Sequence, residues 1–237
     1  MKQKHDMKKL LLKIIKMRGI NALIHRFLRT KFVQKRKSKQ YFSNNQERKL
    51  QIGFGYNPID GWLNTGIAFW ECWNGMYMDA GKPFPLPDNS FDYVFSEHLF
   101  EHLTYQQAQN MLHECYRVMK PGAVMRIATP NLRFLLDLYE NPEKPLHKAY
   151  MENSVKNLGM PSTPAYVISR FHTSWGHQII YDKETLTKAL SDAGFKDITQ
   201  CEMSKSQHAA LNGVEAHFKL FPYEFIQLET MIFEARK

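Results

Sequence analysis

Cysteine is scarce in this chain of 237 residues. The three cysteines, Cys72, Cys115 and Cys201, lie far apart, so they match neither the disulfide framework of a small secreted domain nor the CxxC spacing of a zinc site. The spacing predicts buried, reduced thiols in a cytoplasmic protein.

Long apolar runs are also missing. Lys13 and Lys16 interrupt the most apolar stretch near the N-terminus, which excludes a membrane-spanning helix and a typical secretory signal there. No internal repeat is evident. With 43% hydrophobic residues, the chain fits one large domain with a substantial core better than two independent domains.

Acidic residues are almost absent from the N-terminal arm, residues 1–48. Residues 1–50 hold 16 Lys and Arg against 2 acids, a net charge of +14, whereas the remainder holds 16 against 21, a net charge of −5. Apolar residues between Leu10 and Leu28 recur at helical spacing, with most basic residues opposite. Such an amphipathic helix fits two roles: peripheral contact with an anionic membrane through residues 1–40, or docking on the body. Nucleic-acid binding is not expected, because the basic run 35–39 lacks interleaved aromatic residues.

The body begins with a short strand and a glycine turn. Residues 49–52 lead into Gly53-Phe54-Gly55, where the lack of side chains lets a ligand approach the backbone. Pro58 stands where a dinucleotide-binding turn has its third glycine, which argues against an NAD or FAD fingerprint. The next predicted strand, residues 62–67, follows the glycine turn after only a few residues, whereas parallel neighbouring strands normally need a longer, usually helical crossover. Either the intervening helix is reduced to a turn or one strand is misassigned.

An acidic residue then ends a third strand. Residues 76–79 finish in Asp79, a proline-punctuated loop follows, and residues 91–96 form a fourth strand. A carboxylate at the carboxyl end of a strand lies where open α/β sheets bind polar ligands. Further helices and strands are predicted at 106–119, 124–128, 183–193, 196–203 and 229–235. The order predicts a doubly wound, Rossmann-like, mostly parallel sheet with flanking helices.

Five sequence blocks in order carry a family resemblance: LQIGFG, GWLNTG, MDAGKPFPLPDNSFDYVFSEHLFEHL, ECYRVMKPGAVMRIATPNL and WGHQIIYDKETLTKALSDAGF. They resemble class I S-adenosylmethionine-dependent methyltransferases of the type 11 group, over about residues 49–237. The resemblance implies an enzyme domain at 49–237 behind the arm at 1–48. It also implies S-adenosylmethionine as cofactor and transfer of a methyl group to an oxygen or nitrogen of a small-molecule or glycan acceptor, with a cell-surface sugar as one candidate.

The same resemblance implies a set of cofactor-binding residues. Gly53 and Gly55 would pass under the methionine part, Asp79 would hold the adenine amino group, and Ser96 and Glu97 would line the floor. The family usually has an acid at the end of the second strand to grip the ribose, whereas this chain has Gly66. Candidates to replace that acid are Asn64 and Asp60. Gly66 also favours an alternative, a catalytically degenerate methyltransferase-fold protein that only binds.

Histidines and acids cluster directly after the fourth strand. The run His98-Leu-Phe-Glu101-His102 matches the HxxEH motif of inverted zinc proteases. A strand precedes the run where a protease would continue its helix, so no metal site is predicted. His98, Glu101 and His102 are instead candidates for proton transfer or acceptor contact, against the alternative of structural, hydrogen-bonded side chains. They are expected to begin a helix together with Glu97.

A loop-rich insert is expected at residues 141–181. Its prolines and length are more typical of a lid or binding loop than of a plain connection. The side chains proposed for the acceptor pocket follow at its end: Arg170, His172, Trp175 and His177. In-line methyl transfer depends mainly on positioning two reactants, so few catalytic side chains are required. The expected location is the cytoplasm, peripheral to the membrane if the arm binds lipid.

Overall fold

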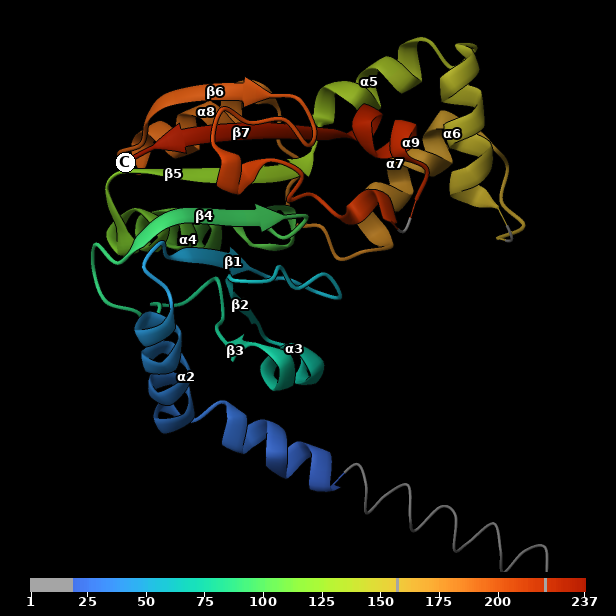
Figure 1. Cartoon of the computed structure of the whole chain (residues 1–237). Coiled ribbons are helices and arrows are strands. Elements are labelled where there is room, and N and C mark those ends of the chain that lie inside the picture. The colour runs from blue at the N-terminus through green and yellow to red at the C-terminus, as the bar shows by residue number, and fades with distance from the viewer. Residues whose placement is uncertain (1–18, 157, 220) are drawn as a thin grey trace, which may run out of the picture.

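A seven-stranded sheet forms the centre of the computed structural model, which describes residues 19–156, 158–219 and 221–237 (Figure 1). The strand order is β3-β2-β1-β4-β5-β7-β6. All neighbouring strands are parallel except β7, which is antiparallel to both β5 and β6. The bounds are β1 (Lys49–Ile52), β2 (Leu63–Gly66), β3 (Met76–Tyr77), β4 (Phe91–Glu97), β5 (Met119–Pro130), β6 (Lys196–Cys201) and β7 (Thr230–Arg236). The predicted mostly parallel α/β sheet is confirmed.

The connection between β1 and β2 contains no helix. The two strands are parallel neighbours, with Leu50 opposite Leu63, and residues 53–62 between them form only turns and irregular chain. The Asn64 side chain holds this connection, because its amide donates to the Ile59 carbonyl and accepts from the Ile59 N–H, both at 3.0 Å. The expected first helix is therefore reduced to turns, and the polar atoms of Asn64 are engaged with the backbone.

The two faces of the sheet are covered differently. The helices α4 (Tyr105–Val118) and α8 (Lys183–Asp192) pack on one face, where the largest apolar cluster lies. Residues 202–216, with the single turn η2 (Ala209–Leu211), cover part of the other face through Leu211 and Val214. Arg126 of β5 is fully buried there and pairs with Glu215 at 2.5 Å and Glu234 at 2.6 Å.

Helices form most of the region beyond the carboxyl ends of β4 and β5 (Figure 1). They are α5 (Leu132–Glu140), α6 (Pro145–Val155), α7 (Pro164–Thr173) and α9 (Tyr223–Glu229), and they share a small apolar core of their own. The expectation of a loop-rich insert at 141–181 was wrong. Pro145 and Pro164 begin helices, because proline lacks only an N–H that the first turn does not use.

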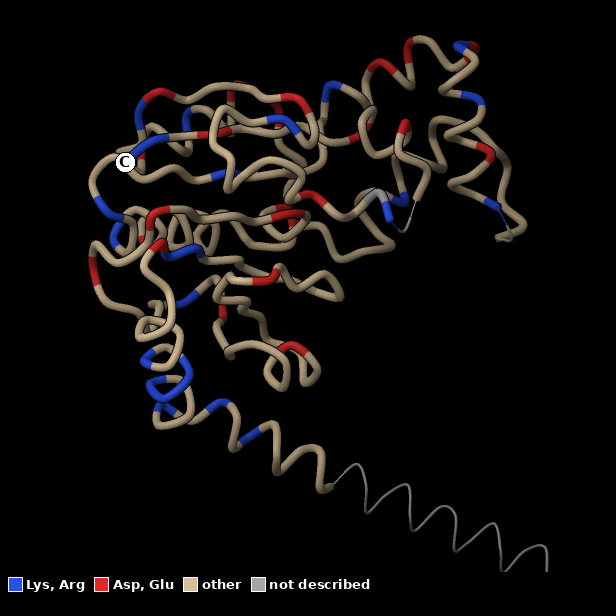
Figure 2. The backbone as a smooth tube through the Cα atoms, viewed as in Figure 1, with Lys and Arg blue, Asp and Glu red and all other residues tan. Residues whose placement is uncertain are grey.

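From residue 19 onward, the N-terminal arm holds two helices. The second, α2 (Lys31–Asn44), packs on the body: Tyr41 is buried, and the Lys37 ammonium donates to the Cys72 carbonyl at 2.8 Å. The first covers residues 19–28 and leaves Leu23 and Phe27 exposed. Figure 2 shows lysine and arginine along both helices. The predicted stripe before residue 19 lies outside the described residues.

None of the helices within the described ranges is both long and apolar enough to cross a membrane.

Candidate functional site

The strand order reverses between β1 and β4, which is where open α/β sheets bind ligands. The glycine turn leaves β1 at this point, and the chain leaving β4 lies against it. Gly53 has φ +69°, and a Cβ placed there would approach the Leu99 side chain to 2.9 Å. A Cβ on Gly55, at φ +53°, would meet nothing within 4 Å. The turn thus needs glycine at both positions, and its backbone is open at Gly55.

A carboxylate lies at the end of β2 although the sequence has glycine there. It belongs to Glu71, in the first turn of α3 (Phe69–Asn74), and a Cβ on Gly66 would lie 2.2 Å from its carboxyl carbon. Its oxygens accept from the N–H groups of Gly55 (2.9 Å), Ile67 (2.9 Å) and Ala68 (2.8 Å). Glu71 is 6% exposed. The helix after β2 thus places a carboxylate at the end of that strand, and Gly66 makes room for it.

Sequence reasoning missed Glu71 and proposed Asn64 or Asp60 in its place. Its signal was a glycine at a position that usually holds an acid, followed by an acid in the first turn of a short helix. The hydrogen bonds of Asn64 to Ile59 give that side chain a role in the connection between β1 and β2.

Asp79 lies two residues beyond β3, at the predicted strand end. Its side chain is 28% exposed, accepts from the Gly81 N–H at 3.0 Å and pairs with Lys82 at 3.2 Å. It also lines a hollow between α2 and the proline loop. A partly exposed carboxylate that follows β3, the neighbour of β2, can accept a hydrogen bond from a ligand bound there.

Ser96 and Glu97, the predicted floor residues, are both turned to the protein interior. Ser96 is fully buried, and its hydroxyl makes no hydrogen bond to any described residue. The Glu97 carboxylate accepts from the N–H groups of Ala216 (3.0 Å) and His217 (3.0 Å). Burial raises the pKa of Glu97, and these two N–H groups act against that shift. Glu97 therefore fastens the C-terminal segment to the end of β4, and it ends a strand where a helix start was expected.

A cavity of about 530 Å³ opens beyond β4, β5 and β7, beneath the helices α6, α7 and α9. Aromatic side chains line much of it, and its titratable residues are His98, Glu101, His102, Tyr150, Lys156, Arg170, His177, His217 and Glu229. Of the proposed acceptor residues, Arg170, Trp175 and His177 face this cavity, and the Arg170 guanidinium lies 5.1 Å from the centre of the Trp175 ring. His172 is exposed on α7, outside the cavity lining.

His98 and Glu101 form a buried pair at the cavity wall. The His98 Nδ1 lies 3.1 Å from the Glu101 carboxylate, whose other oxygen accepts from the Thr129 hydroxyl at 3.0 Å. Burial lowers the pKa of His98, but the hydrogen bond to Glu101 and the nearby carboxylates outweigh it, so this pKa is raised. Burial likewise opposes ionisation of Glu101, yet the bond to His98 lowers its pKa. The backbone of His98 is left-handed, with φ +47°, a strained conformation for a residue with a side chain.

The HxxEH residues separate instead of sharing one helical face. His98 follows β4, and Glu101 and His102 lie in the single turn η1 (Phe100–His102). The His98 ring stacks on His217 with 4.1 Å between ring centres, whereas His102 meets His177 at 4.8 Å. The geometry of a protease zinc helix is therefore absent from this segment. His217 and Glu229 were not predicted, because they lie more than a hundred residues away in sequence and only the fold brings them here.

Comparison with known proteins agrees with this geometry. Residues 74–127 match the family model described as a methyltransferase domain. A probable S-adenosylmethionine-dependent methyltransferase of Mycolicibacterium smegmatis is 41% identical over 63 residues, which cover 27% of this chain and 24% of that protein. The chain thus matches about a quarter of the length of this curated relative.

Solved structures give more distant likenesses. An S-adenosylmethionine-dependent methyltransferase from Archaeoglobus fulgidus is 20% identical with a TM-score of 0.45, covering 96% of this chain and 99% of that one. One from Mesorhizobium loti is 14% identical with a TM-score of 0.49, covering 84% and 96%. Over residues 74–127 the chain is thus similar to S-adenosylmethionine-dependent methyltransferases, the group that its sequence blocks resemble.

The cofactor of this family fits the residues present. Gly55 leaves the turn after β1 open to a ligand, and the carboxylates of Glu71 and Asp79 follow β2 and β3 in adjacent positions of the sheet. Carboxylates are suited to the hydroxyl and amino groups of a nucleoside.

Proposed function

We propose that this protein transfers a methyl group from S-adenosylmethionine to an oxygen or nitrogen of an acceptor bound in the cavity beyond β4. One observation carries the proposal: the glycine turn and the cavity meet at consecutive residues. Leu99 packs against Gly53, while His98 lines the cavity. A donor on the turn and an acceptor in the cavity would therefore be neighbours, as an in-line displacement requires.

The acceptor is a small molecule or a sugar of a glycan, held by Arg170, Trp175 and His177. Aromatic walls supply apolar contact, and the Arg170 guanidinium and cavity imidazoles supply polar contacts. His98, Glu101 and His102 border the side nearest the turn, where they would contact and orient the nucleophile. Gly66 favoured a non-catalytic alternative, and Glu71 weakens it because the carboxylate is present from another residue.

Two measurements test this proposal. Calorimetric titration with S-adenosylmethionine should show binding, and Asp79→Ala should weaken it. The absence of heat at millimolar cofactor would refute the enzyme proposal. A screen of hydroxyl and amine acceptors with methyl-labelled cofactor then seeks the product. Cofactor binding without transfer to any acceptor would favour the binding-protein alternative.

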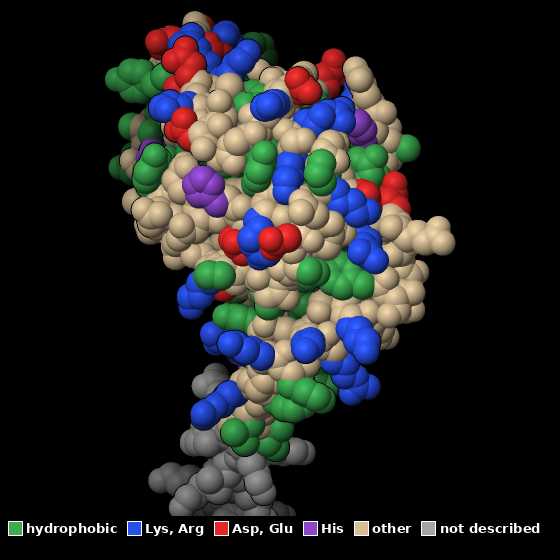
Figure 3. All heavy atoms as spheres, turned by 90° about the vertical axis from the view of Figure 1, so that its left-hand side faces the viewer, with side chains coloured by type: hydrophobic (Ala, Val, Ile, Leu, Met, Phe, Trp, Pro, Cys, Tyr) green, Lys and Arg blue, Asp and Glu red, His purple; other side chains and the backbone are tan. Residues whose placement is uncertain are grey.

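We also propose that the arm contacts an anionic membrane surface. The exposed apolar side chains of residues 19–32 support this, namely Ile20, Leu23, Phe27 and Phe32, together with the basic residues beside them (Figure 3). The alternative was that the arm docks on the body, and α2 is the part of the arm that packs there. Sedimentation with vesicles of anionic lipid should fall for the double variant Leu23→Glu/Phe27→Glu and stay unchanged for Leu136→Glu, an exposed position on α5. Equal sedimentation of both variants would refute membrane contact.

A further inference from the structure

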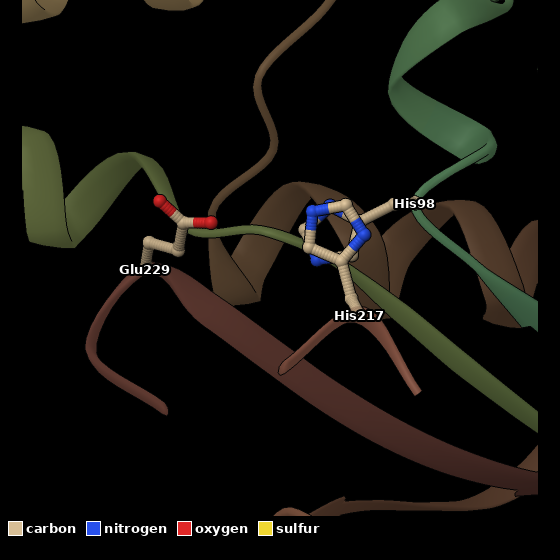
Figure 4. A group of neighbouring side chains, drawn as sticks. All are labelled: His98, His217 and Glu229. Atoms are coloured by element: carbon tan, nitrogen blue, oxygen red, sulfur yellow. The ribbon is translucent and has the colours of Figure 1, made fainter. Parts of the chain in front are cut away.

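One wall of the cavity brings two imidazoles and a carboxylate together from distant parts of the chain. His98 follows β4, His217 begins the turn η3 (His217–Lys219), and Glu229 ends α9. Each offers one ligand atom, and these atoms lie within 4.8 Å of one another. Figure 4 shows the Glu229 carboxylate beside the overlapping rings of His98 and His217. Two histidines and a glutamate are a donor set found in catalytic zinc sites.

We propose that His98, His217 and Glu229 bind one divalent transition-metal ion of the Zn²⁺ class. Imidazole nitrogen suits zinc and its first-row neighbours better than it suits Mg²⁺ or Ca²⁺. The role of the ion in methyl transfer rests on the proposed function. Metal binding itself does not, because it can be measured without an acceptor.

The surroundings of His98 resemble those of a metal-bound histidine. Its Nδ1 faces the Glu101 carboxylate, and Nε2 faces the hydroxyl of Thr230, the residue after Glu229, at 3.0 Å. A carboxylate behind one ring nitrogen fixes the tautomer and leaves the other nitrogen to bind the ion. Glu101 itself accepts a hydrogen bond from Thr129, so the carboxylate that orients His98 is also fixed. The ion would replace the Thr230 hydroxyl as the partner of Nε2.

His217 and Glu229 are available as the other two ligands. The ring of His217 makes no hydrogen bond to any residue that the structure describes; it stacks on His98 and lies beside the tilted ring of Phe221. Glu229 accepts a hydrogen bond from the Tyr150 hydroxyl, which orients the carboxylate and leaves further lone pairs free.

Binding requires a modest rotation of side chains. Ligand atoms around a tetrahedral zinc ion with bonds of about 2.0–2.1 Å lie about 3.4 Å apart, and the two rings are stacked with an interplanar angle of 24°. Their lone pairs converge if His217 turns about its side-chain torsions. The hydrogen bond between Nδ1 and Glu101 holds the His98 ring in place.

A second trio in the same cavity, Glu101, His102 and His177, also brings its ligand atoms within 4.8 Å. We take it as the weaker site, because the Glu101 carboxylate is fully buried and lies against His98 and Thr129, so that it serves as their partner. Glu101 thus supports His98 and is not counted as a ligand. A metal ion in the first trio would polarise an acceptor hydroxyl and lower its pKa.

The test uses the full chain, stripped with a chelator and titrated with Co²⁺, whose visible absorption is intense when four ligands surround it. We expect one Co²⁺ per chain, displaced by Zn²⁺. His217→Ala and Glu229→Gln should abolish the absorption, and Glu101→Gln should weaken binding about 10- to 100-fold. His113→Ala, at an exposed position of α4, is the matched control and should bind as the unmodified chain does.

Two results would overturn the proposal. One is the absence of stoichiometric binding by the unmodified chain. The other is binding that survives His217→Ala and Glu229→Gln but is lost in His102→Ala or His177→Ala, which would place the ion in the second trio. Thermal unfolding of each variant identifies any that fail to fold. Titration of the stripped chain with S-adenosylmethionine tests the proposed function separately, because the glycine turn holds no residue of the trio.

Discussion

Replacing Glu71 by glutamine should reduce both the stability of the fold and the affinity for S-adenosylmethionine. The carboxylate accepts three backbone hydrogen bonds, from Gly55, Ile67 and Ala68. A glutamine amide has one accepting oxygen, so if it stays with Ile67 and Ala68, its NH₂ group faces the Gly55 N–H. One charge-assisted bond of about 1.5–3 kcal/mol is lost, and two donors face each other.

The free energy of unfolding should therefore fall by about 2–4 kcal/mol. For a chain of this size, that corresponds to roughly 4–16 °C in the melting temperature. The cofactor should lose the charged acceptor at the end of β2. If that acceptor contributes about 1.5–3 kcal/mol, the Kd for S-adenosylmethionine rises about 10- to 150-fold.

The assay is calorimetric titration with the cofactor, well below the melting temperature of each variant. Glu184→Gln is the matched control, because Glu184 also lies in the first turn of a helix, α8, but is exposed. Unchanged cofactor affinity in a destabilised Glu71→Gln variant would refute the role in cofactor binding and leave Glu71 as a brace for the turn. Unchanged stability would contradict the hydrogen-bond reasoning itself.

Three further predictions concern the glycine turn, the buried arginine and a partly buried glutamate. Gly53→Ala should cost about 1–2 kcal/mol for its left-handed φ and more for the Leu99 contact, whereas Gly61→Ala, at φ +77° with nothing within 4 Å of its Cβ, should show the first cost alone in chemical denaturation. Arg126→Met should lower the free energy of unfolding by about 3–5 kcal/mol, because two buried carboxylates lose their partner; a loss as small as that of the exposed Arg236→Met would contradict it. Glu114 has its pKa lowered from 4.5, chiefly by its hydrogen bond to Arg117, so its contribution is present above pH 4.5 and disappears as the pH falls through the lowered value. Glu114→Gln should thus destabilise the protein by about 1–2 kcal/mol at pH 7 and by less in acid, as followed by denaturation across pH; a constant difference would be inconsistent with this linkage.

The positions of the strands and of several helices along the chain could be predicted, because local signals mark them. Asp182 caps α8 by accepting from the Thr185 N–H, and Gly194 ends that region at φ +100°, as the sequence indicated. Helices that begin with proline were missed. In α6 and α7, proline was read as a helix breaker although it stands at the first helical position.

The residues of the candidate site could be predicted only where they belong to a local sequence motif. Gly53, Gly55 and Asp79 lie at the expected strand ends, because residues directly after parallel strands share one edge of a sheet. Glu71 fills a position that the sequence leaves blank, and no local pattern gives the direction of its side chain. His217 and Glu229 reach His98 through the return of β7 beside β5, a long-range pairing that periodicity does not encode.

The two walls of the cavity are held by different kinds of contact, and this affects how the specificity for the acceptor can change. Residues 202–217 are bound to the sheet by ionic and charge-assisted contacts at Arg126 and Glu97. The opposite wall, on α6 and α7, belongs to a separate apolar core. Apolar packing tolerates replacement by residues of similar volume, whereas a buried ion pair does not tolerate loss of one partner. Substitutions in α6 and α7 can therefore reshape what the cavity admits, while the strand ends that align donor and acceptor keep their geometry.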